Sequence, residues 1–353
     1  MKKLLCTLLA CVAVQAHARV DLDTLLTATR NRDQPKLNQL KEAARGDVLE
    51  VYVHYHWLSA QIRTVGGNEV RSFLSRYGNT HLADRVRSEW LNELGRRQDW
   101  AGYLAEYGKY STPSIEQRCL YAQAALSLNQ NVEAALASSR PAWFSGKAQP
   151  EACTPVFDAL FAQNQLQADD AWARIRLALA ANNVDLAAAI AKRTSEAEAL
   201  SLRELANLQT QPEAGWPRLQ QTRAEQEKAL FAITRLARSA PEKAAALLQT
   251  SQANWPVDNL EHAWRTIAIE AAKKHLPQAS AWFELANNQA GEEEHRAWSI
   301  RAALRIGDWG KVLSRIEALP ATERELSAWR YWRAYALREL GQPQAAIQAF
   351  IAV

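Results

Sequence analysis

Residues 328–350 read AWRYWRAYALRELGQPQAAIQAF, and this stretch decides the fold. The spacing of its apolar residues predicts a helix that ends at Leu340, and Gly341 and Pro343 predict a turn after it. A second helix should follow, with an apolar stripe that needs a neighbouring element to cover it. The stripe consists of Ala346, Ile347, Phe350 and Ile351. The stretch is therefore a helix–turn–helix unit with one face still open.

Similar breaks recur along the chain, each with a polar or glycine-containing turn before a helix that opens with small or apolar residues. They are RRQDWAGYL (96–104), SLNQNVEAAL (127–136), AANNVDLAAAI (180–190), IGDWGKVL (306–313) and LGQPQAAI (340–347). Asp308 and Gln342 occupy matching turn positions, separated by the roughly 34-residue period of tetratricopeptide repeats. The earlier spacings are irregular, so we interpret the chain as a degenerate array of antiparallel helical hairpins.

The predicted fold class is all-α: a right-handed superhelix of stacked helical hairpins, a TPR-like α-solenoid that spans residues 19–353 as one domain. No convincing strand is found, and only VLEVYVHYHWL (48–58) is ambiguous, because it alternates and is rich in β-branched residues. The 13 tryptophans fit this fold, since large rings fill gaps between adjacent hairpins. Sugar stacking is the alternative role for any one of them.

Composition narrows the class of protein. The chain has 353 residues, 48% of them hydrophobic, and only 13 glycines and 12 prolines, which suits a large helical core. Its net charge of +4 is small, and it falls further if Lys2 and Lys3 are removed with a leader. So small a charge argues against nucleic acid as the main partner.

The N-terminus has the pattern of a cleaved secretory signal. Two lysines precede an apolar run from Leu4 to Val14, and Ala16-His17-Ala18 provides a cleavage site after Ala18. The run is too short to span a bilayer as a stable helix, and no later segment is apolar enough to do so. A lipoprotein signal ending at Cys11 is the alternative. We therefore expect residues 1–18 to be a signal peptide and the mature protein to be soluble and periplasmic.

Export leaves two cysteines, Cys119 and Cys153, because Cys6 and Cys11 lie in the signal. Two cysteines in an oxidising compartment suggest one disulfide, with two free buried thiols as the alternative. A zinc site is disfavoured, because neither residue has a CxxC partner or a nearby histidine cluster.

The sequence predicts no catalytic, cofactor-binding or metal-ligating residue. His54 and His56 are two apart and have no third ligand near, so structural roles are expected. The acidic run from Glu292 to Glu294 before His295 fits the first turn of a helix. The arginines between 85 and 97 alternate with acids, which indicates a solvated, salt-bridged helix face. There is no phosphate loop, GxSxG or HExxH motif.

Several segments resemble the N-terminal region of the soluble lytic murein transglycosylases of Gram-negative bacteria. They are FLSRYGNTHLADRVRSEWLNELGRRQDWAGYLAEY (73–107), RCLYAQAAL (118–126), RPAWFSGKAQPEACTPVF (140–157), WARIRLALAANNVDLAAAIAKR (172–193) and AWRYWRAYALRELGQ (328–342). The likeness extends from about Asp21 to the end of the chain. No single motif is decisive, but their order behind a signal peptide is specific.

The resemblance implies an all-helical superhelix that, in this family, precedes a linker and a lysozyme-like catalytic domain. It implies cleavage of the bond between N-acetylmuramic acid and N-acetylglucosamine, with glycan strands and possibly other cell-wall proteins as partners. One glutamic acid of the family acts as general acid and then as base. The resemblance also implies that Cys119 and Cys153 are the family's disulfide pair.

The chain departs from this family in one respect. The catalytic glutamate lies in a Glu-Ser motif followed by Gly-Leu-Met-Gln, yet the chain has no Glu-Ser and its only methionine is Met1. No position inherits the catalytic role. We therefore expect an inactive superhelical portion, truncated at its C-terminal end, in which Ile347, Phe350 and Ile351 are exposed. The alternatives are a free-standing periplasmic adaptor that binds a protein partner, and a sugar-binding module.

Overall fold

The computed structural model describes residues 20–213, 222–286 and 292–352. Throughout these ranges the regular structure is helical, with α-helices and short 3-10 turns and no strand. The prediction of an all-α fold is therefore confirmed. The signal peptide predicted at residues 1–18 lies outside the described residues.

The chain divides into two compact units. The first runs to Ala142 and includes Gln149–Gln163, and the second comprises Trp143–Ala148 and the chain from Asn164 onward. The helices of the first unit are α1 Leu22–Arg30, α2 Gln34–Ala43, α3 Glu50–Ala60, α4 Gly67–Tyr77, α5 His81–Arg97, α6 Trp100–Tyr107, α7 Ile115–Leu128, α8 Val132–Ser139 and α9 Thr154–Ala162. The prediction that residues 19–353 form one domain stays a prediction.

The helices of the second unit continue this numbering. They are α10 Ala168–Ala180, α11 Val184–Ala191, α12 Leu202–Thr210, α13 Arg223–Ser239, α14 Pro241–Ser251, α15 Val257–Lys273, α16 Ala279–Trp282, α17 Glu293–Ile306, α18 Trp309–Glu317, α19 Ala321–Arg324, α20 Ser327–Glu339 and α21 Pro343–Ile351. The 3-10 turns are Arg140–Trp143, Glu151–Cys153, Ala197–Leu200, Gln252–Asn254 and Phe283–Leu285.

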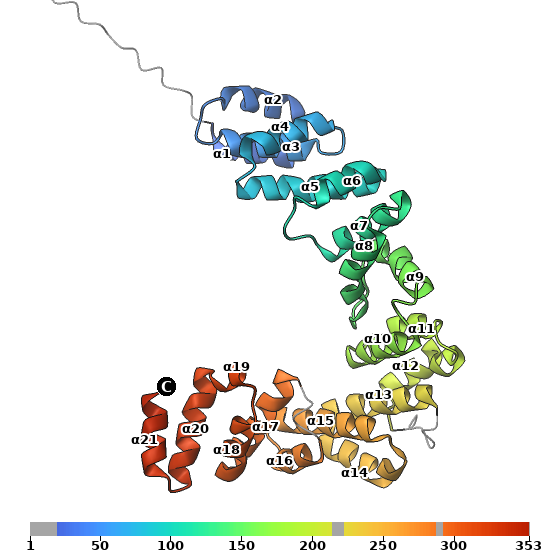
Figure 1. Ribbon diagram of the computed structural model, residues 1–353, viewed down its shortest axis with the longest axis vertical. Coiled ribbons are helices and arrows are strands. Elements are labelled where there is room, and N and C mark those ends of the chain that lie inside the picture. Colours follow the sequence, from blue (N-terminus) through green and yellow to red (C-terminus); the bar gives the residue numbers. More distant parts are fainter. Residues whose placement is uncertain (1–19, 214–221, 287–291, 353) are drawn as a thin grey trace, which may run out of the picture. The chain divides into compact units, whose positions relative to one another are not determined.

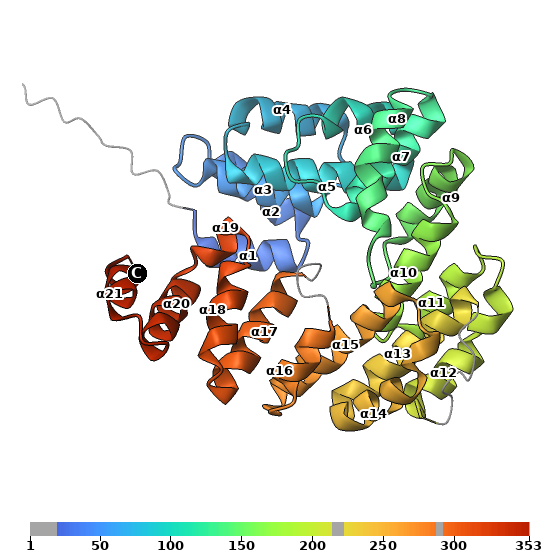
Figure 2. The same cartoon turned by 60° about the horizontal axis from the view of Figure 1, so that its bottom comes forward.

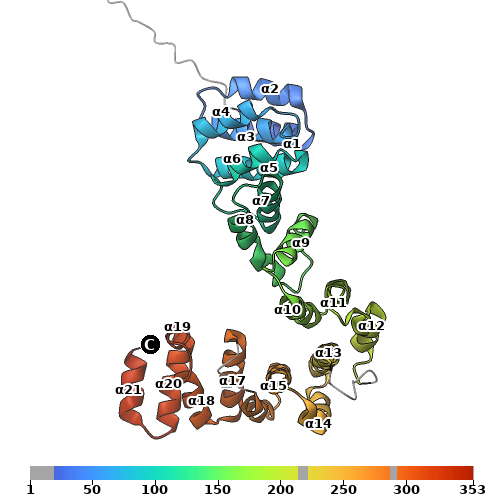
Figure 3. The ribbon, with the colours of Figure 1, turned by 45° about the vertical axis from the view of Figure 1, so that its right-hand side comes forward.

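Consecutive helices pack side by side within each unit. In the second unit, α17, α18, α20 and α21 follow one another in Figures 1 and 3. In the first unit, Figure 2 shows α3 beside α5, although α4 separates them in the sequence. This succession of neighbours is the stacking of helical hairpins that the recurring turns predict.

The hairpins share one turn geometry. After α5, Gln98 adopts a left-handed conformation (φ 55°), and the Asp99 N–H donates to the Leu94 carbonyl at 3.0 Å. Asp99 Oδ1 then accepts a hydrogen bond from the Gly102 N–H at 3.0 Å and caps α6. The same arrangement recurs at Arg32–Asp33, Asn182–Asn183 and Gly307–Asp308, and without a side-chain cap at Gly341–Gln342. One helix thus ends and the next begins within a turn of only a few residues.

The ambiguous stretch at residues 48–58 is helical. Helix α3 begins at Glu50, and its buried residues Val53, Tyr55 and Leu58 face more than one neighbour, since α3 contacts α1, α2, α4 and α5. A helix enclosed on several sides needs apolar residues around its circumference, which gives it the alternating pattern of a strand.

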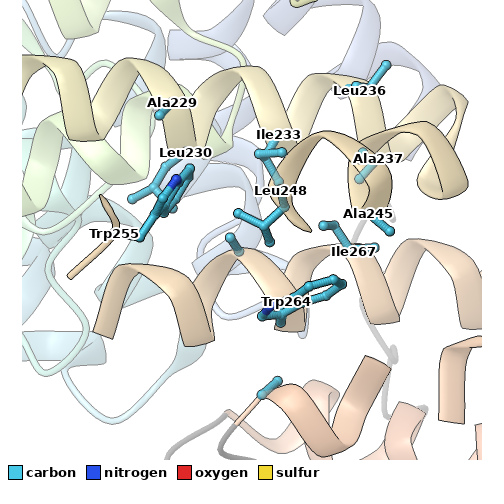
Figure 4. Packing of buried hydrophobic residues seen from close by; sticks show 13 residues of the cluster. Ala229, Leu230, Ile233, Leu236, Ala237, Ala245, Leu248, Trp255, Trp264 and Ile267 are labelled. Atoms are coloured by element: carbon cyan, nitrogen blue, oxygen red, sulfur yellow. The ribbon is translucent and has the colours of Figure 1, made fainter. Parts of the chain in front are cut away.

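Buried side chains join the hairpins into cores, as the cluster between α13, α14 and α15 shows (Figure 4). Ile233, Leu248 and Ile267 are fully buried there, one from each helix. Trp264 is 2% exposed and Trp255 is 7% exposed. These two tryptophans fill space between neighbouring helices, as expected for aromatic residues at helical spacing.

A disulfide joins Cys119 on α7 to Cys153, which precedes α9. Both side chains are fully buried. Nearby, the Gln123 side-chain amide donates to the Ala152 carbonyl at 2.6 Å. The bond therefore fastens the start of α9 to α7 inside the first unit.

The charged face of α5 is less exposed than the sequence indicates. Glu93 is only 4% exposed, and its carboxylate accepts hydrogen bonds from Arg96 at 2.7 Å and from Arg97 at 2.5 Å. Arg97 also donates to the Arg63 carbonyl at 2.7 Å. The hydrogen bonds from Arg96, followed by those from Arg97, lower the pKa of Glu93 to about 2. The expectation of a solvated face is wrong for Glu93, whose buried carboxylate is hydrogen-bonded to Arg96 and Arg97, and Arg97 in turn reaches the α3–α4 connection.

The last helix has an open side. Ile347 is 57% exposed and Ile351 is 75% exposed, as the sequence predicts for an uncovered stripe. Phe350 differs from the prediction, since it is half-buried with its ring edge-on to Tyr331, their centroids 5.9 Å apart. α21 therefore packs on α20 with one flank and leaves the other flank in water.

Replacing Cys119 and Cys153 together by alanine should lower the free energy of unfolding by about 3 kcal/mol, because the unfolded chain regains the freedom that the cross-link removes. Urea denaturation followed by circular dichroism measures the loss. A reducing agent should produce a similar loss in the wild-type protein and none in the double variant. Equal stability of wild type and variant would show that the bond contributes nothing.

Glu93→Gln should lower the free energy of unfolding at pH 7 by about 2 kcal/mol, because charge-assisted hydrogen bonds to a buried carboxylate are lost. The folded-state pKa lies below the ordinary 4.5. This stabilisation is therefore complete above about pH 4.5 and disappears as the pH falls toward 2.

Urea denaturation between pH 3 and 7 measures this difference. The matched control is Glu133→Gln, which changes an exposed glutamate in the first turn of α8 and should cost less than about 1 kcal/mol at any pH. A loss for Glu93→Gln that stayed constant with pH would contradict the assignment.

Candidate functional site

A hollow of about 440 Å³ lies in the second unit where α15, α17 and α20 meet. We call it the α15–α17–α20 groove. Its lining residues are Ala272, His275, Leu276, Trp298, Arg301, Ala302, Leu304, Arg305 and Trp332. The floor is aliphatic and aromatic, whereas the polar groups of the lining are two guanidinium groups and one imidazole.

Helix α17 supplies most of this lining because of its periodicity. Trp298, Arg301 and Arg305 are spaced i, i+3 and i+7, so they lie on one face of the helix. The guanidinium carbon of Arg301 lies 5.1 Å from the ring centroid of Trp298 and 5.5 Å from that of Trp329. The guanidinium group of Arg301 packs against these two indole rings. The N–H groups at its edge can still donate hydrogen bonds to a ligand.

The electrostatic character of the groove is positive. None of its lining residues is acidic. Glu294 lies one turn before Trp298 on α17, but it is paired with Lys273, whose Nζ is 3.1 Å from its carboxylate. Arg301 and Arg305 are both exposed. The groove therefore presents fixed cationic groups beside an apolar floor.

A second hollow, of about 660 Å³, lies in the first unit between the α3–α4 connection and α5. Its lining has donors and acceptors of both charges, including Arg96, Glu89, Asn92, Ser59 and Thr64. The side chains can accept hydrogen bonds as well as donate them, so this α3–α5 hollow differs chemically from the α15–α17–α20 groove.

The two histidines considered as metal ligands lie on α3 among aromatic rings. His54 packs edge-on against Phe73, with centroids 5.3 Å apart, and His56 against Tyr52 at 4.8 Å. Burial, reinforced by the charges of Lys41 and Arg76, lowers the pKa of His54 to about 4. Burial also lowers the pKa of His56. Both rings are therefore neutral packing groups at pH 7.

The acidic run before His295 starts a helix, as predicted. Glu292 is the N-cap of α17, and its backbone N–H donates to His295 Nδ1 at 2.9 Å. Glu293 and Glu294 occupy the first turn, where negative charge is favoured. Across residues 20–213, 222–286 and 292–352, no three His, Cys, Asp or Glu side chains gather so that they could hold a metal ion.

Sequence reasoning missed a buried ionic network in the second unit. Glu227 on α13 is 1% exposed and accepts hydrogen bonds from Arg176 at 2.7 and 2.9 Å and from Arg223 at 3.0 Å. Arg176 also donates to Asn259 Oδ1 at 2.8 Å. The network joins α10, α13 and α15, whose residues are far apart in the sequence. The groove was also missed, although the spacing of Trp298, Arg301 and Arg305 was a usable signal.

Comparison with curated proteins finds relatives of one kind, while no family model matches the chain. The soluble lytic murein transglycosylase of Escherichia coli K12 is 25% identical over 324 residues, which is 88% of this chain and 49% of the relative. That of Salmonella typhimurium is 26% identical over 318 residues, with the same coverage. The chain thus spans about half the length of the curated relatives it matches.

Solved structures agree with the sequence comparison. An inactive mutant of the lytic transglycosylase Slt from Pseudomonas aeruginosa matches with a TM-score of 0.73 and 26% identity, over 93% of this chain and 54% of that structure. The 70 kDa soluble lytic transglycosylase of Escherichia coli matches with a TM-score of 0.67 at 24% identity, over the same shares. At that identity the second match supports the fold alone.

None of the described helices has both the length and the hydropathy that a membrane-spanning helix requires. The sequence and structural matches agree with each other and cover nearly all of the described chain. The resemblance seen in the sequence is thereby confirmed: the chain is a relative of the soluble lytic murein transglycosylases that spans about half the length of the curated members.

Proposed function

We propose that the chain is the helical scaffold portion of a periplasmic peptidoglycan lytic transglycosylase and has no glycosidase activity alone. The observation that carries this proposal is the structural match to a lytic transglycosylase over 93% of this chain but only 54% of that structure, with a TM-score of 0.73. In the parent enzyme, the scaffold would hold a catalytic domain and contact glycan strands while the bond between MurNAc and GlcNAc is cleaved.

Inactivity follows from the chemistry that the chain lacks. Glycosidic cleavage needs a carboxylic acid that protonates the leaving oxygen. The family's Glu-Ser and Gly-Leu-Met-Gln motifs do not occur in this sequence. Glu93 is one of the most buried glutamates, and the hydrogen bonds from Arg96 and Arg97 lower its pKa to about 2, so it is not suited to donate a proton.

The periplasmic location rests on the N-terminal pattern and on the cysteines. The predicted signal ends with cleavage after Ala18, and the bond between Cys119 and Cys153 suits an oxidising compartment. Cleavage at that site and export across the inner membrane are parts of the proposal.

The open flank of α21 belongs to the same proposal. Ile347 and Ile351 lie exposed on a helix whose other flank is packed on α20. In a stack of hairpins, a flank of this kind is covered by the next unit. We infer that a further helical hairpin of the parent enzyme packs there.

A free-standing periplasmic adaptor that binds a protein partner is the second candidate. The observation that favours it is the α15–α17–α20 groove, which has an apolar floor and a positive rim on the surface of the second unit.

Incubation of the purified chain with murein sacculi should release no anhydromuropeptides above a protein-free blank, because the Glu-Ser motif that holds the family's catalytic glutamate does not occur in the sequence. Chromatography of the soluble fraction measures release. The full-length Escherichia coli relative provides the positive control under the same conditions. Release by this chain would overturn the proposed inactivity.

The exposed flank of α21 should make the chain self-associate as its concentration rises, because contiguous exposed apolar surface promotes contact between molecules. Substitution of Ile347 and Ile351 by glutamate should abolish this self-association. Sedimentation velocity over a range of protein concentrations measures this. The matched control is Leu202→Glu, which changes an exposed leucine on α12 and should leave association unchanged. If wild type and the double variant sediment alike at all concentrations, the flank of α21 does not mediate self-association.

A further inference from the structure

We propose that the α15–α17–α20 groove binds an acidic peptide segment of a partner protein. An apolar side chain of that segment would lie on the floor formed by Leu276, Trp298 and Trp332. Aspartate or glutamate side chains beside it would bind Arg301 and Arg305. This inference is independent of the proposed murein-related role, since it depends only on the groove.

The tryptophans of the floor are backed by buried core clusters and offer apolar surface to a ligand. Trp298 packs against the cluster around Phe283, and Trp332 packs against the cluster around Val312 and Ile316. Both indoles are half-buried, so each is held by its own core and shows the remaining surface to the groove. A side chain seated there removes apolar surface from water without requiring the floor to reorganise.

The rim selects the charge of the ligand. Within the described parts of the chain, Arg305 forms no ion pair, and Arg301 is engaged only by the rings of Trp298 and Trp329. Carboxylates bind guanidinium groups through paired, charge-assisted hydrogen bonds. No acidic residue lines the groove, and Glu294, whose carboxylate lies next to the Trp298 side chain, is paired with Lys273.

Other arginines of the same hairpins have a structural role, in contrast to the two arginines of the groove. Arg296, on the same helix as Arg301, donates to Glu323 through Nε at 3.0 Å and so ties α17 to α19. Arg315 on α18 donates to the Ser299 carbonyl at 2.6 Å and is paired with Glu284. These arginines hold elements together, whereas those of the groove face outward with donors to spare.

The lining disfavours a neutral carbohydrate. Each sugar hydroxyl is a donor as well as an acceptor, and a donor that loses water without gaining an acceptor is costly. The polar side chains of the groove are Arg301, Arg305 and His275, none of which brings a carboxylate or amide oxygen. The α3–α5 hollow, with Glu89 and Asn92, has such oxygens. The chemistry of the groove therefore points to a peptide with carboxylates.

The test is selection from a random peptide library displayed on phage, using the full chain as bait. Peptides enriched on the wild type are then labelled and titrated by fluorescence anisotropy against wild type, Arg305→Glu and Arg203→Glu. Arg203 is an exposed arginine on α12 and provides a matched change of charge away from the groove. Circular dichroism and melting curves verify that both variants fold.

We expect the enriched peptides to combine Asp or Glu with a bulky apolar residue. Their affinity should fall at least about tenfold in Arg305→Glu, because reversal of a charge that contacts the ligand replaces attraction by repulsion. It should stay within about twofold in Arg203→Glu and should weaken with added salt.

Three results would overturn the proposal. One is the absence of any peptide that prefers the wild type over Arg305→Glu. Another is enrichment of basic or uncharged peptides. The third is displacement of the bound peptide by chitin oligosaccharides, which would make the groove a carbohydrate site. None of these results bears on whether the chain digests murein.

Discussion

A helical hairpin cannot bury its apolar stripe by itself, and the rest of this structure depends on that constraint. Many pairs of helices are joined by a very short turn, such as Gln98–Asp99 between α5 and α6. The turn makes the pair antiparallel, but the free faces of the pair must still be covered by other hairpins. Stacking is therefore the condition under which these helices are stable.

Stacking also determines where polar groups are buried. Glu93 and Glu227 lie on helices with many charged neighbours, yet each is enclosed where another hairpin packs over it. Their arginine partners make the enclosure tolerable, because a buried carboxylate without a partner is strongly destabilising. The pair of Arg176 on α10 with Glu227 on α13 joins two helices, so it favours one arrangement of them: a shifted hairpin would leave these charges unpaired. Apolar contacts alone are less selective.

The same stacking produces the α15–α17–α20 groove. Its residues come from three separate helices, and each of its two indoles is held by a different core cluster. The likeness to lytic transglycosylases accounts for the stacked hairpins, and the groove adds a surface with its own chemistry. A scaffold built from repeated hairpins can acquire such a surface at low cost, because exposed residues change without disturbing the cores.

Local patterns made the fold predictable. The positive φ at Gly307 and Gly341, the caps Asp99 and Asp308, and the acidic start of α17 each follow from residues adjacent in the sequence. The stretch at residues 48–58 was ambiguous, because a helix buried on several sides loses its one-sided pattern. The exposure of Glu93 was predicted wrongly for a related reason. The residues that cover a helix face belong to other segments, so the sequence of the helix itself does not reveal them.

By itself, the sequence determined the helical hairpins, their turns, the open stripe of α21 and the likeness to lytic transglycosylases. The hairpins, the turns and the stripe depend on residues within one or two helical turns of each other, whereas the likeness depends on the order of several segments along the chain. Only the tertiary structure decided which charges are buried, how Arg176, Glu227 and Asn259 meet, and that Trp298, Arg301 and Trp332 share a groove. Burial and charge pairing across hairpins depend on the packing of distant segments, which no local spacing encodes.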